Sequence, residues 1–269
     1  MAIMNGNDII GLVGNIVIKQ GKDGKKIVQS RAGQYKQNKE SVRTSKMFGY
    51  GSSVASVIRH QLDATFGSNY DSAMINRFNN PIREVLSHCY NPADKTFIFE
   101  EDSFSRLAEF EFNIKSPLIN HLWVKPTMTL EGNTLKVSIP EFKVPSQFTF
   151  PRKTNTCKVS ITISKLNISQ ALTGWELYHT FEVSAAQEIH PSQELVFEVE
   201  NECLCVAVIG LFYSQKDNGS STNYNSKAFG PANVIGAVIT PGVYVEPPAP
   251  SISHSVSGRE WTFESKLQF

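Results

Sequence analysis

The residues of this chain best suited to chemistry are two closely spaced cysteines, Cys203 and Cys205, and a histidine next to a cysteine, His88 and Cys89. Cys203 and Cys205 are separated by one residue and would share one side of a strand. A zinc site needs further ligands, and no second Cys or His pair stands at ligand spacing, so we interpret both thiols as small buried side chains. His88 and Cys89 could form a nucleophilic pair, but adjacent residues on a helix point in different directions.

Two glycine-containing stretches approach known motifs without meeting them. A nucleophile elbow requires Gly-x-Ser-x-Gly, whereas residues 49–53 read Gly-Tyr-Gly-Ser-Ser in a helical pattern. A phosphate loop requires a glycine five residues upstream of Gly-Lys and a hydroxyl residue after it; Gly21-Lys22 has no glycine at that distance and is followed by Asp23. We therefore predict that the protein is not an enzyme and uses no cofactor or metal ion.

The middle of the chain has helical and then β periodicity. Apolar residues recur at three-to-four spacing within residues 37–92, which predicts a helical segment of two helices, with a kink or a new helix start at Pro81. Residues 93–245 carry about eight short alternating stretches separated by Gly, Pro and Asn. This pattern predicts an α+β, mainly β fold, in which an antiparallel β-sandwich (jelly-roll-like or immunoglobulin-like) follows the helices. The strands are expected within 107–113, 127–130, 134–139, 158–164, 176–183, 194–199, 204–213 and 234–240, with a polar loop at 216–227.

Both ends of the chain have segments capable of forming strands. Residues 1–36 read as an extended basic arm, with a β-hairpin over residues 14–29 that turns at Asp23-Gly24. Residues 246–269 read as a proline-rich linker and a terminal strand that places its large apolar side chains on one face. A strand of this kind needs a sheet to complete, either its own or a neighbour's. The side chains that we expect at an assembly interface are Ile16, Ile18, Ile27, Trp261, Phe263, Leu267 and Phe269.

Charge is distributed unevenly along the chain. Residues 19–46 contain nine basic and two acidic residues, whereas residues 166–215 contain seven glutamates and no Lys or Arg. These runs can be ordinary solvated surfaces, the basic run can bind nucleic acid, or it can meet the acidic surface of another copy. We favour a second copy over nucleic acid, because the complementary charge is already present in the chain and few aromatic residues interrupt the basic run. The basic arm comprises Lys19, Lys22, Lys25, Lys26, Arg31 and Lys36, and the acidic face comprises Glu176, Glu182, Glu194, Glu198 and Glu200.

Composition indicates where the protein resides. The 269 residues carry a net charge of +1, the start of the chain has no basic n-region of a secretory signal, and no apolar run is long enough to span a membrane. The four cysteines have no scaffold-like spacing, which indicates reduced thiols. We expect a protein of the cytoplasm, or of a particle assembled there, without a membrane partner.

Parts of the sequence resemble a family of uncharacterised proteins common in Bacteroidota genomes. The resemblance is carried by residues 11–17, by Gly24-Lys25-Lys26, by Ser30-Arg31 and the polar run to residue 44, and by the helix over residues 53–62; residues 195–197 and 205–210 are similar more loosely. The family tends to have proline after the arginine, where this chain has Ala32. The resemblance implies a glycine-rich N-terminal arm, helices and a β-rich C-terminal half, and it implies no activity.

These patterns favour a structural subunit that assembles with copies of itself into a filament, a phage-tail-like tube or a shell-like particle through exchanged terminal segments. Neighbouring structural proteins are further possible partners. The first alternative is a β-sandwich module that binds glycan or protein, for which Trp123, Trp175 and Tyr224 could be stacking platforms, although we expect such aromatics to be buried in the core. The second alternative is nucleic-acid binding through the basic arm.

Overall fold

The chain forms two compact units, residues 1–43 and 44–269. The computed structural model describes residues 2–5, 8–21, 23–33, 38–217, 219–245 and 261–269. Two helices and several antiparallel sheets confirm the predicted α+β, mainly β fold class. The jelly-roll-like or immunoglobulin-like type of the sandwich stays a prediction.

The first unit contains a four-stranded antiparallel sheet in the order β1-β2-β3-β4. Its strands are β1 (Ala2–Asn5), β2 (Asp8–Val13), β3 (Ile16–Gln20) and β4 (Lys26–Ser30). The predicted hairpin is confirmed, since Ile18 lies opposite Val28 and Gly24 takes the positive φ of 73° that its turn requires. The two further strands, β1 and β2, that extend this hairpin into a sheet were not predicted from the sequence.

The second unit is built on a seven-stranded antiparallel sheet centred on β10 (Thr156–Asn167) and β15 (Leu204–Asp217). One edge of β10 pairs with β15, and its other edge pairs with β12 and β11. The far edge of β15 pairs with β17 and β16. The remaining strands of this sheet are β11 (Leu172–Gly174), β12 (Leu177–Ser184), β16 (Ser220–Asn223), β17 (Ala232–Ile239) and β18 (Trp261–Phe263).

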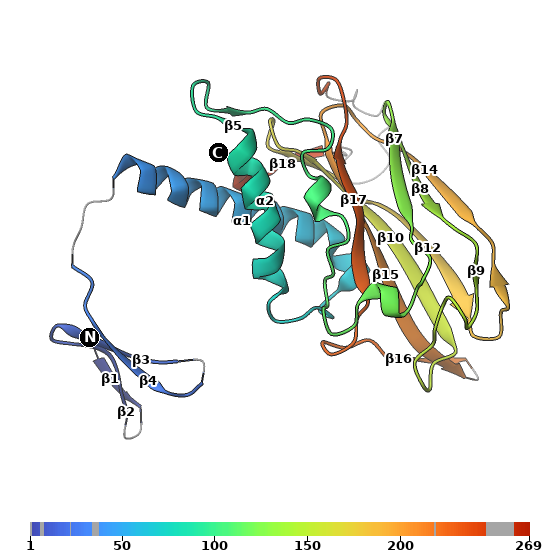
Figure 1. Ribbon diagram of the computed structural model, residues 1–269, viewed down its shortest axis with the longest axis horizontal. Helices are drawn as coiled ribbons and strands as arrows, with labels where there is room; N and C mark the ends of the chain where they lie inside the picture. Colours follow the sequence, from blue (N-terminus) through green and yellow to red (C-terminus); the bar gives the residue numbers. More distant parts are fainter. Residues whose placement is uncertain (1, 6–7, 22, 34–37, 218, 246–260) are drawn as a thin grey trace, which may run out of the picture. The chain divides into compact units, whose positions relative to one another are not determined.

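A second, three-stranded sheet packs on one face of the large sheet, and the helices pack on its other face (Figure 1). The three strands are β7 (Thr127–Glu131), β8 (Thr134–Ile139) and β14 (Gln193–Glu198). Along β15, Ala207 and Ile209 belong to the core cluster that includes β8, whereas Val206 and Val208 belong to the cluster that includes the helices. Because both faces are covered, the middle of β15 is a continuous apolar run instead of an alternating one.

The helices are α1 (Lys39–Phe66) and α2 (Met74–Cys89). Pro81 lies inside α2, which continues through it, so no new helix starts there. The two helices approach closely at Gly51, where an added Cβ would lie 2.4 Å from Cγ of Arg83. Among the described residues, neither helix combines the length and apolar character that a membrane span requires.

Short elements complete the second unit. They are β5 (Tyr90–Asn91), β6 (Thr96–Phe97), β9 (Phe142–Lys143), β13 (Ile189–His190) and the 3₁₀ helices Ser105–Leu107, Leu118–Asn120 and Ser265–Leu267.

Two local predictions in this unit were wrong. The alternating stretch 107–113 is no strand, because Glu109 takes a positive φ of 64° and only Glu111 forms a bridge, with Asn233. The expected loop at 216–227 contains a hairpin instead, in which the end of β15 pairs with β16.

Candidate assembly interface

The N-terminal sheet is folded without a core of its own. None of the described residues in 1–43 has a buried side chain, although the sheet is rich in Ile, Val, Leu and Met. A sheet of this size usually needs a second layer for stability. Its large exposed apolar side chains are Ile3, Met4, Ile9, Val13, Ile16, Ile27 and Val28.

These apolar side chains occupy both faces of the sheet. Ile16 and Ile18 share a face with Val28, because Ile18 and Val28 are directly opposite each other. Ile27 lies opposite Lys19, so its side chain is on the other face. The predicted interface residues of the hairpin therefore belong to two faces instead of one. Sequence reasoning missed the contribution of β1 and β2, whose only signal is the apolar content of residues 2–4 and 9–13.

The basic arm surrounds this sheet without forming one basic face. The exposed basic residues are Lys19, Lys25, Lys26 and Arg31. Lys26 lies opposite Gln20, the residue after Lys19, so Lys19 and Lys26 are on opposite faces of the sheet. Lys22 and Lys36 lie outside the described residues. The described strands of the sheet contain no aromatic residue that could stack on a base.

The C-terminal residues dock on their own unit. β18 pairs antiparallel with β11, with Trp261 opposite Gly174 and Phe263 opposite Leu172. The indole Nε1 of Trp261 donates to Oε1 of Glu200 at 3.0 Å, and Nζ of Lys165 lies 5.2 Å from the centre of its ring. Gly174 makes room for this ring, since an added Cβ would lie 2.9 Å from the indole.

The predicted nine-residue terminal strand was therefore wrong in length and in its faces. β18 ends at Phe263, and a 3₁₀ turn follows at Ser265–Leu267. The turn breaks the period of two, and Leu267 is buried in the cluster that includes α1. Phe263 is exposed although it is two residues from the buried Trp261 on the same strand. The hydroxyl of Tyr50 donates to the carbonyl of Leu267 at 2.9 Å, and Phe269 packs edge-on against the Tyr50 ring at 4.9 Å. The linker residues 246–260 lie outside the described residues.

The acidic residues lie at three places on the second unit. Glu182 is on β12 and Glu176 precedes that strand, whereas Glu194 and Glu198 are on the exposed face of β14 in the other sheet. Glu200 is partly buried and pairs with Lys165 at 3.1 Å. The described residues thus place no single acidic face, but two glutamates flank or occupy one edge strand of the large sheet.

The candidate chemical residues are built into the core. Cys203 and Cys205 are buried in the cluster between the two sheets, and burial raises the pKa of the Cys205 thiol to about 12. A thiol with this pKa is protonated at neutral pH and unreactive. Cys89 is half-buried at the end of α2, where its Sγ lies 3.8 Å from Oγ of Ser103.

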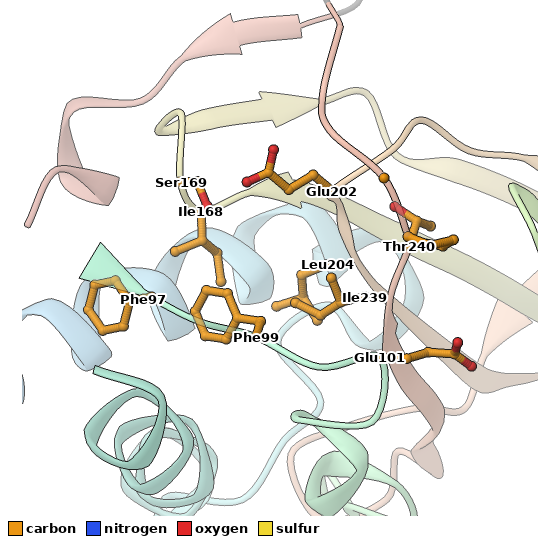
Figure 2. A pocket seen from close by; sticks show the side chains of 11 residues that line it. Phe97, Phe99, Glu101, Ile168, Ser169, Glu202, Leu204, Ile239 and Thr240 are labelled. Carbon is orange, nitrogen blue, oxygen red and sulfur yellow. The ribbon is translucent and has the colours of Figure 1, made fainter. Parts of the chain in front are cut away.

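A recess of about 210 Å³ lies between β17 and the segment that carries Phe97 and Phe99 (Figure 2). Its walls combine apolar and polar groups, and Figure 2 shows the carboxylates of Glu101 and Glu202 at separate rims of the recess. Glu202 accepts a hydrogen bond from the backbone N–H of Tyr244 at 3.1 Å. Two carboxylates placed in this way do not face a common reacting atom, as general acid–base catalysis would require.

Two buried carboxylates have a structural role beside α2. Asp71 pairs with Arg77 and accepts from the backbone N–H of Ala73 at 2.8 Å. Burial acts to raise the pKa of Asp71, but these hydrogen bonds and the charge of Arg77 outweigh it and hold the pKa below its usual range. Burial raises the pKa of Glu111, although the backbone N–H of Leu118 and the Asn233 amide donate to it.

The large aromatic residues considered as stacking platforms are exposed, which corrects the expectation that they are buried. Trp123 and Trp175 are 59% and 57% exposed, and Tyr224 is 43% exposed. Trp123 follows a 3₁₀ helix and Trp175 connects β11 to β12, so no single element carries both. Their sequence context gave no sign of this exposure.

No protein-family model, curated protein or solved structure matches this chain.

Proposed function

We propose that the protein is a non-enzymatic structural subunit that assembles with copies of itself into a filament, a phage-tail-like tube or a shell-like particle. The N-terminal sheet is the assembling element. The observation that carries this proposal is a folded four-stranded sheet without one buried side chain among its described residues. Neighbouring structural proteins are further partners under this proposal, and no cofactor is involved.

The exposed apolar surface of this sheet is large enough to drive association. Seven large apolar side chains of the sheet are exposed. Complete burial of such a side chain contributes about 1.5–3 kcal/mol, so burying four of them against another copy contributes at most about 6–12 kcal/mol. Ordering costs reduce this gain, which leaves room for charge pairs to select the partner and its register.

The C-terminal docking limits which end can be exchanged. Trp261 and Leu267 are buried on their own unit, so the C-terminal segment supports the fold of the subunit. Assembly by both ends is thus reduced to assembly by the N-terminal end alone. All four cysteines are free, which supports the cytoplasm, or a particle assembled there, as the location.

Sedimentation velocity of a charged double variant tests the proposal. Ile16→Glu with Val28→Glu places two carboxylates on one face of the N-terminal sheet. We expect this variant to lose at least about 3 kcal/mol of association free energy, about a hundredfold in the dissociation constant. The matched control is Ile98→Glu with Ile119→Glu, two exposed isoleucines of the second unit, which should assemble like the natural protein. A natural protein that stays monomeric at all concentrations, or a double variant that assembles as well as the control, would refute the proposal.

A second candidate function is a β-sandwich module that binds glycan or protein. The exposure of Trp123 and Trp175 favours it, because exposed indoles are common stacking platforms for sugars. Screening the protein on a glycan array, followed by Trp123→Ala and Trp175→Ala, tests this function. An array without a ligand removes it for glycans.

The exposed basic side chains of the N-terminal sheet keep nucleic-acid binding as a further alternative. Such binding would depend on phosphate contacts and would fall steeply with salt. An electrophoretic mobility shift at low salt tests it, and the absence of a shifted band removes it.

A further inference from the structure

Within the part of the chain that the structure describes, β12 is an edge strand of the large sheet with no partner on its outer side. This strand has eight residues, and its described pairing is with β10 alone. In an antiparallel pair, alternate residues direct their backbone N–H and C=O groups away from the partner strand. Among the described residues, no backbone group bonds to this outer edge between Leu177 and Val183.

β12 has few of the features that protect natural sheet edges, and Glu182 is the only acidic or basic residue on the strand besides His179. Its sequence, Leu-Tyr-His-Thr-Phe-Glu-Val-Ser, contains no proline or lysine, and its register with β10 is continuous from end to end, without a bulge. Tyr178 on this strand is 73% exposed, so the described part of the chain does not cover the Tyr178 side chain. An edge of this kind is suited to accept an added strand.

The N-terminal sheet has an edge strand of opposite charge. Among the described residues, β4 forms strand pairing with β3 alone, and all five of its side chains are exposed. Lys25 precedes it, Lys26 begins it and Arg31 follows it. The other edge of that sheet is β1, whose sequence Ala-Ile-Met-Asn carries no charge.

We propose that β12 of one copy accepts β4 of a second copy as an added antiparallel strand, with Lys26 opposite Glu182. This inference rests on the proposed function and names the contact that produces the assembly. The opposite charges of the two segments favour this pairing, because residues 166–215 contain no Lys or Arg and include Glu176 and Glu188 on either side of β12.

One register satisfies the charges and the apolar residues together. With Lys26 opposite Glu182, Ile27 lies opposite the half-buried Phe181, and Val28 lies opposite Thr180. Directly opposite side chains in a sheet lie close enough for ionic and aromatic–aliphatic pairs to interact. The same register places Arg31 opposite Leu177, one position from Glu176. A shift by one residue would place Ile27 against Glu182 and would reverse the faces of the added strand.

An ion pair within the subunit is weak enough to exchange for the new pair. Glu182 pairs with Lys216, and both side chains are about half exposed. Exposed ion pairs contribute little to stability, so Glu182 can turn to Lys26 at small cost.

Disulfide trapping between separately prepared chains tests the contact and its register. Val28→Cys is introduced in one preparation of the full chain and Thr180→Cys in another, and the two are mixed and oxidised. Opposite positions of paired strands have the Cα separation that a disulfide needs. We expect a disulfide-linked dimer that contains one chain of each kind. The matched control is Val28→Cys mixed with Tyr178→Cys, which is on the same face but two residues away and should cross-link about tenfold less.

A charge exchange provides an independent measurement. Glu182→Lys alone and Lys26→Glu alone should each weaken self-association about fivefold or more, and mixing the two variants should restore it. Restoration in the mixture requires that the two residues meet across copies.

The outcomes separate this inference from the proposed function. If the natural protein assembles but the mixed cysteines do not cross-link preferentially and the charge exchange has no effect, the β4–β12 contact is wrong and assembly uses another surface. A disulfide that forms only within a doubly substituted chain also overturns the contact between copies. A protein that stays monomeric refutes the proposed function itself.

Discussion

Trp261→Ala is the substitution that most directly tests how the C-terminal end is used. The indole ring is 6% exposed, its Nε1 donates to Glu200 at 3.0 Å, and the ring packs edge-on against Tyr244 at 5.4 Å between centres. If the terminus belongs to its own subunit, removing this ring must destabilise the monomer and not only an assembly.

The size of the effect follows from these contacts. Truncation of a buried Trp to Ala typically costs about 3–5 kcal/mol, because apolar burial is lost and a cavity remains. For a chain of this size, about 4 kcal/mol lowers the melting temperature by about 10 °C. Trp261→Phe keeps most of the ring and loses the hydrogen bond to Glu200, so it should cost about 1–2 kcal/mol.

Chemical denaturation of the full chain, followed by circular dichroism, measures these changes. Phe263→Ala is the matched control, because Phe263 is on the same short strand and is 59% exposed. We expect this control to stay within about 0.5 kcal/mol of the natural protein. If Trp261→Ala leaves the unfolding free energy unchanged and instead shifts the oligomer distribution, the terminus acts between copies and the docking described above is wrong.

Three further predictions concern the core and its buried carboxylates. Gly210→Ala should destabilise the protein by about 3 kcal/mol in the same denaturation assay, because the new Cβ would lie 2.0 Å from the carbonyl oxygen of Thr65. Gly49→Ala is the control: its new Cβ would have no atom within 4 Å, so this variant should be neutral or stabilising. The lowered pKa of Asp71 contributes stability that is present above its unfolded pKa of about 3.9 and is lost as the pH falls through the folded pKa. In a pH series of melting temperatures, Asp71→Asn should therefore melt at a lower temperature at pH 7. Its melting temperature should also fall less steeply than that of the natural protein as the pH is lowered. The pKa of Glu111 is raised instead of lowered, so the contribution of Glu111 to stability declines as the pH rises from its unfolded pKa of about 4.3 through its folded pKa. Glu111→Gln should remove this decline without loss of stability at pH 7. A variant that is less stable at pH 7 would contradict the reasoning.

Strands with regular alternation or continuous apolar character could be predicted from the sequence. Residues 134–139 alternate because one face of β8 is buried against the large sheet, and residues 204–213 are uniformly apolar because β15 is buried on both faces. The two helices were predictable for a related reason, since their apolar stripe faces the same large sheet.

Alternation failed where aromatic side chains are buried without a strand. Residues 107–113 alternate in polarity, yet Phe110 and Phe112 stack edge-on against each other under α2 while the backbone turns at Glu109. The prediction for the C-terminal segment failed for a similar reason, because Trp261 is buried from a short strand and Leu267 from a 3₁₀ turn. Periodicity reports which side chains are apolar, and these contacts depend on tertiary partners far along the chain.

The candidate interface could be predicted in part. The basic hairpin and the acidic region of the chain are visible in composition, but the free edge of β12 is not, because a strand becomes an edge only through the topology of the whole sheet. The sequence of β12 alternates like that of β8, which is paired on both sides. Only the order of the strands in the folded sheet distinguishes the edge strand β12 from a strand that is paired on both sides.

The difference between the donor strand and the acceptor strand determines what kind of assembly can form. β4 and β12 belong to different sheets of the chain, so in the proposed contact each copy has one donor strand and one acceptor strand. Heterologous contacts close into rings when the rotation between copies divides a full turn, and otherwise they extend into filaments. The contact forms a two-fold dimer when two copies exchange β4 reciprocally, and a larger ring or a filament when each copy donates β4 to a third copy, a difference that negative-stain images of the natural protein would reveal. Particles limited to closed two-fold dimers would require both strands to be exchanged reciprocally, and in that case the cross-linked chains would carry two disulfides per pair in a doubly substituted protein.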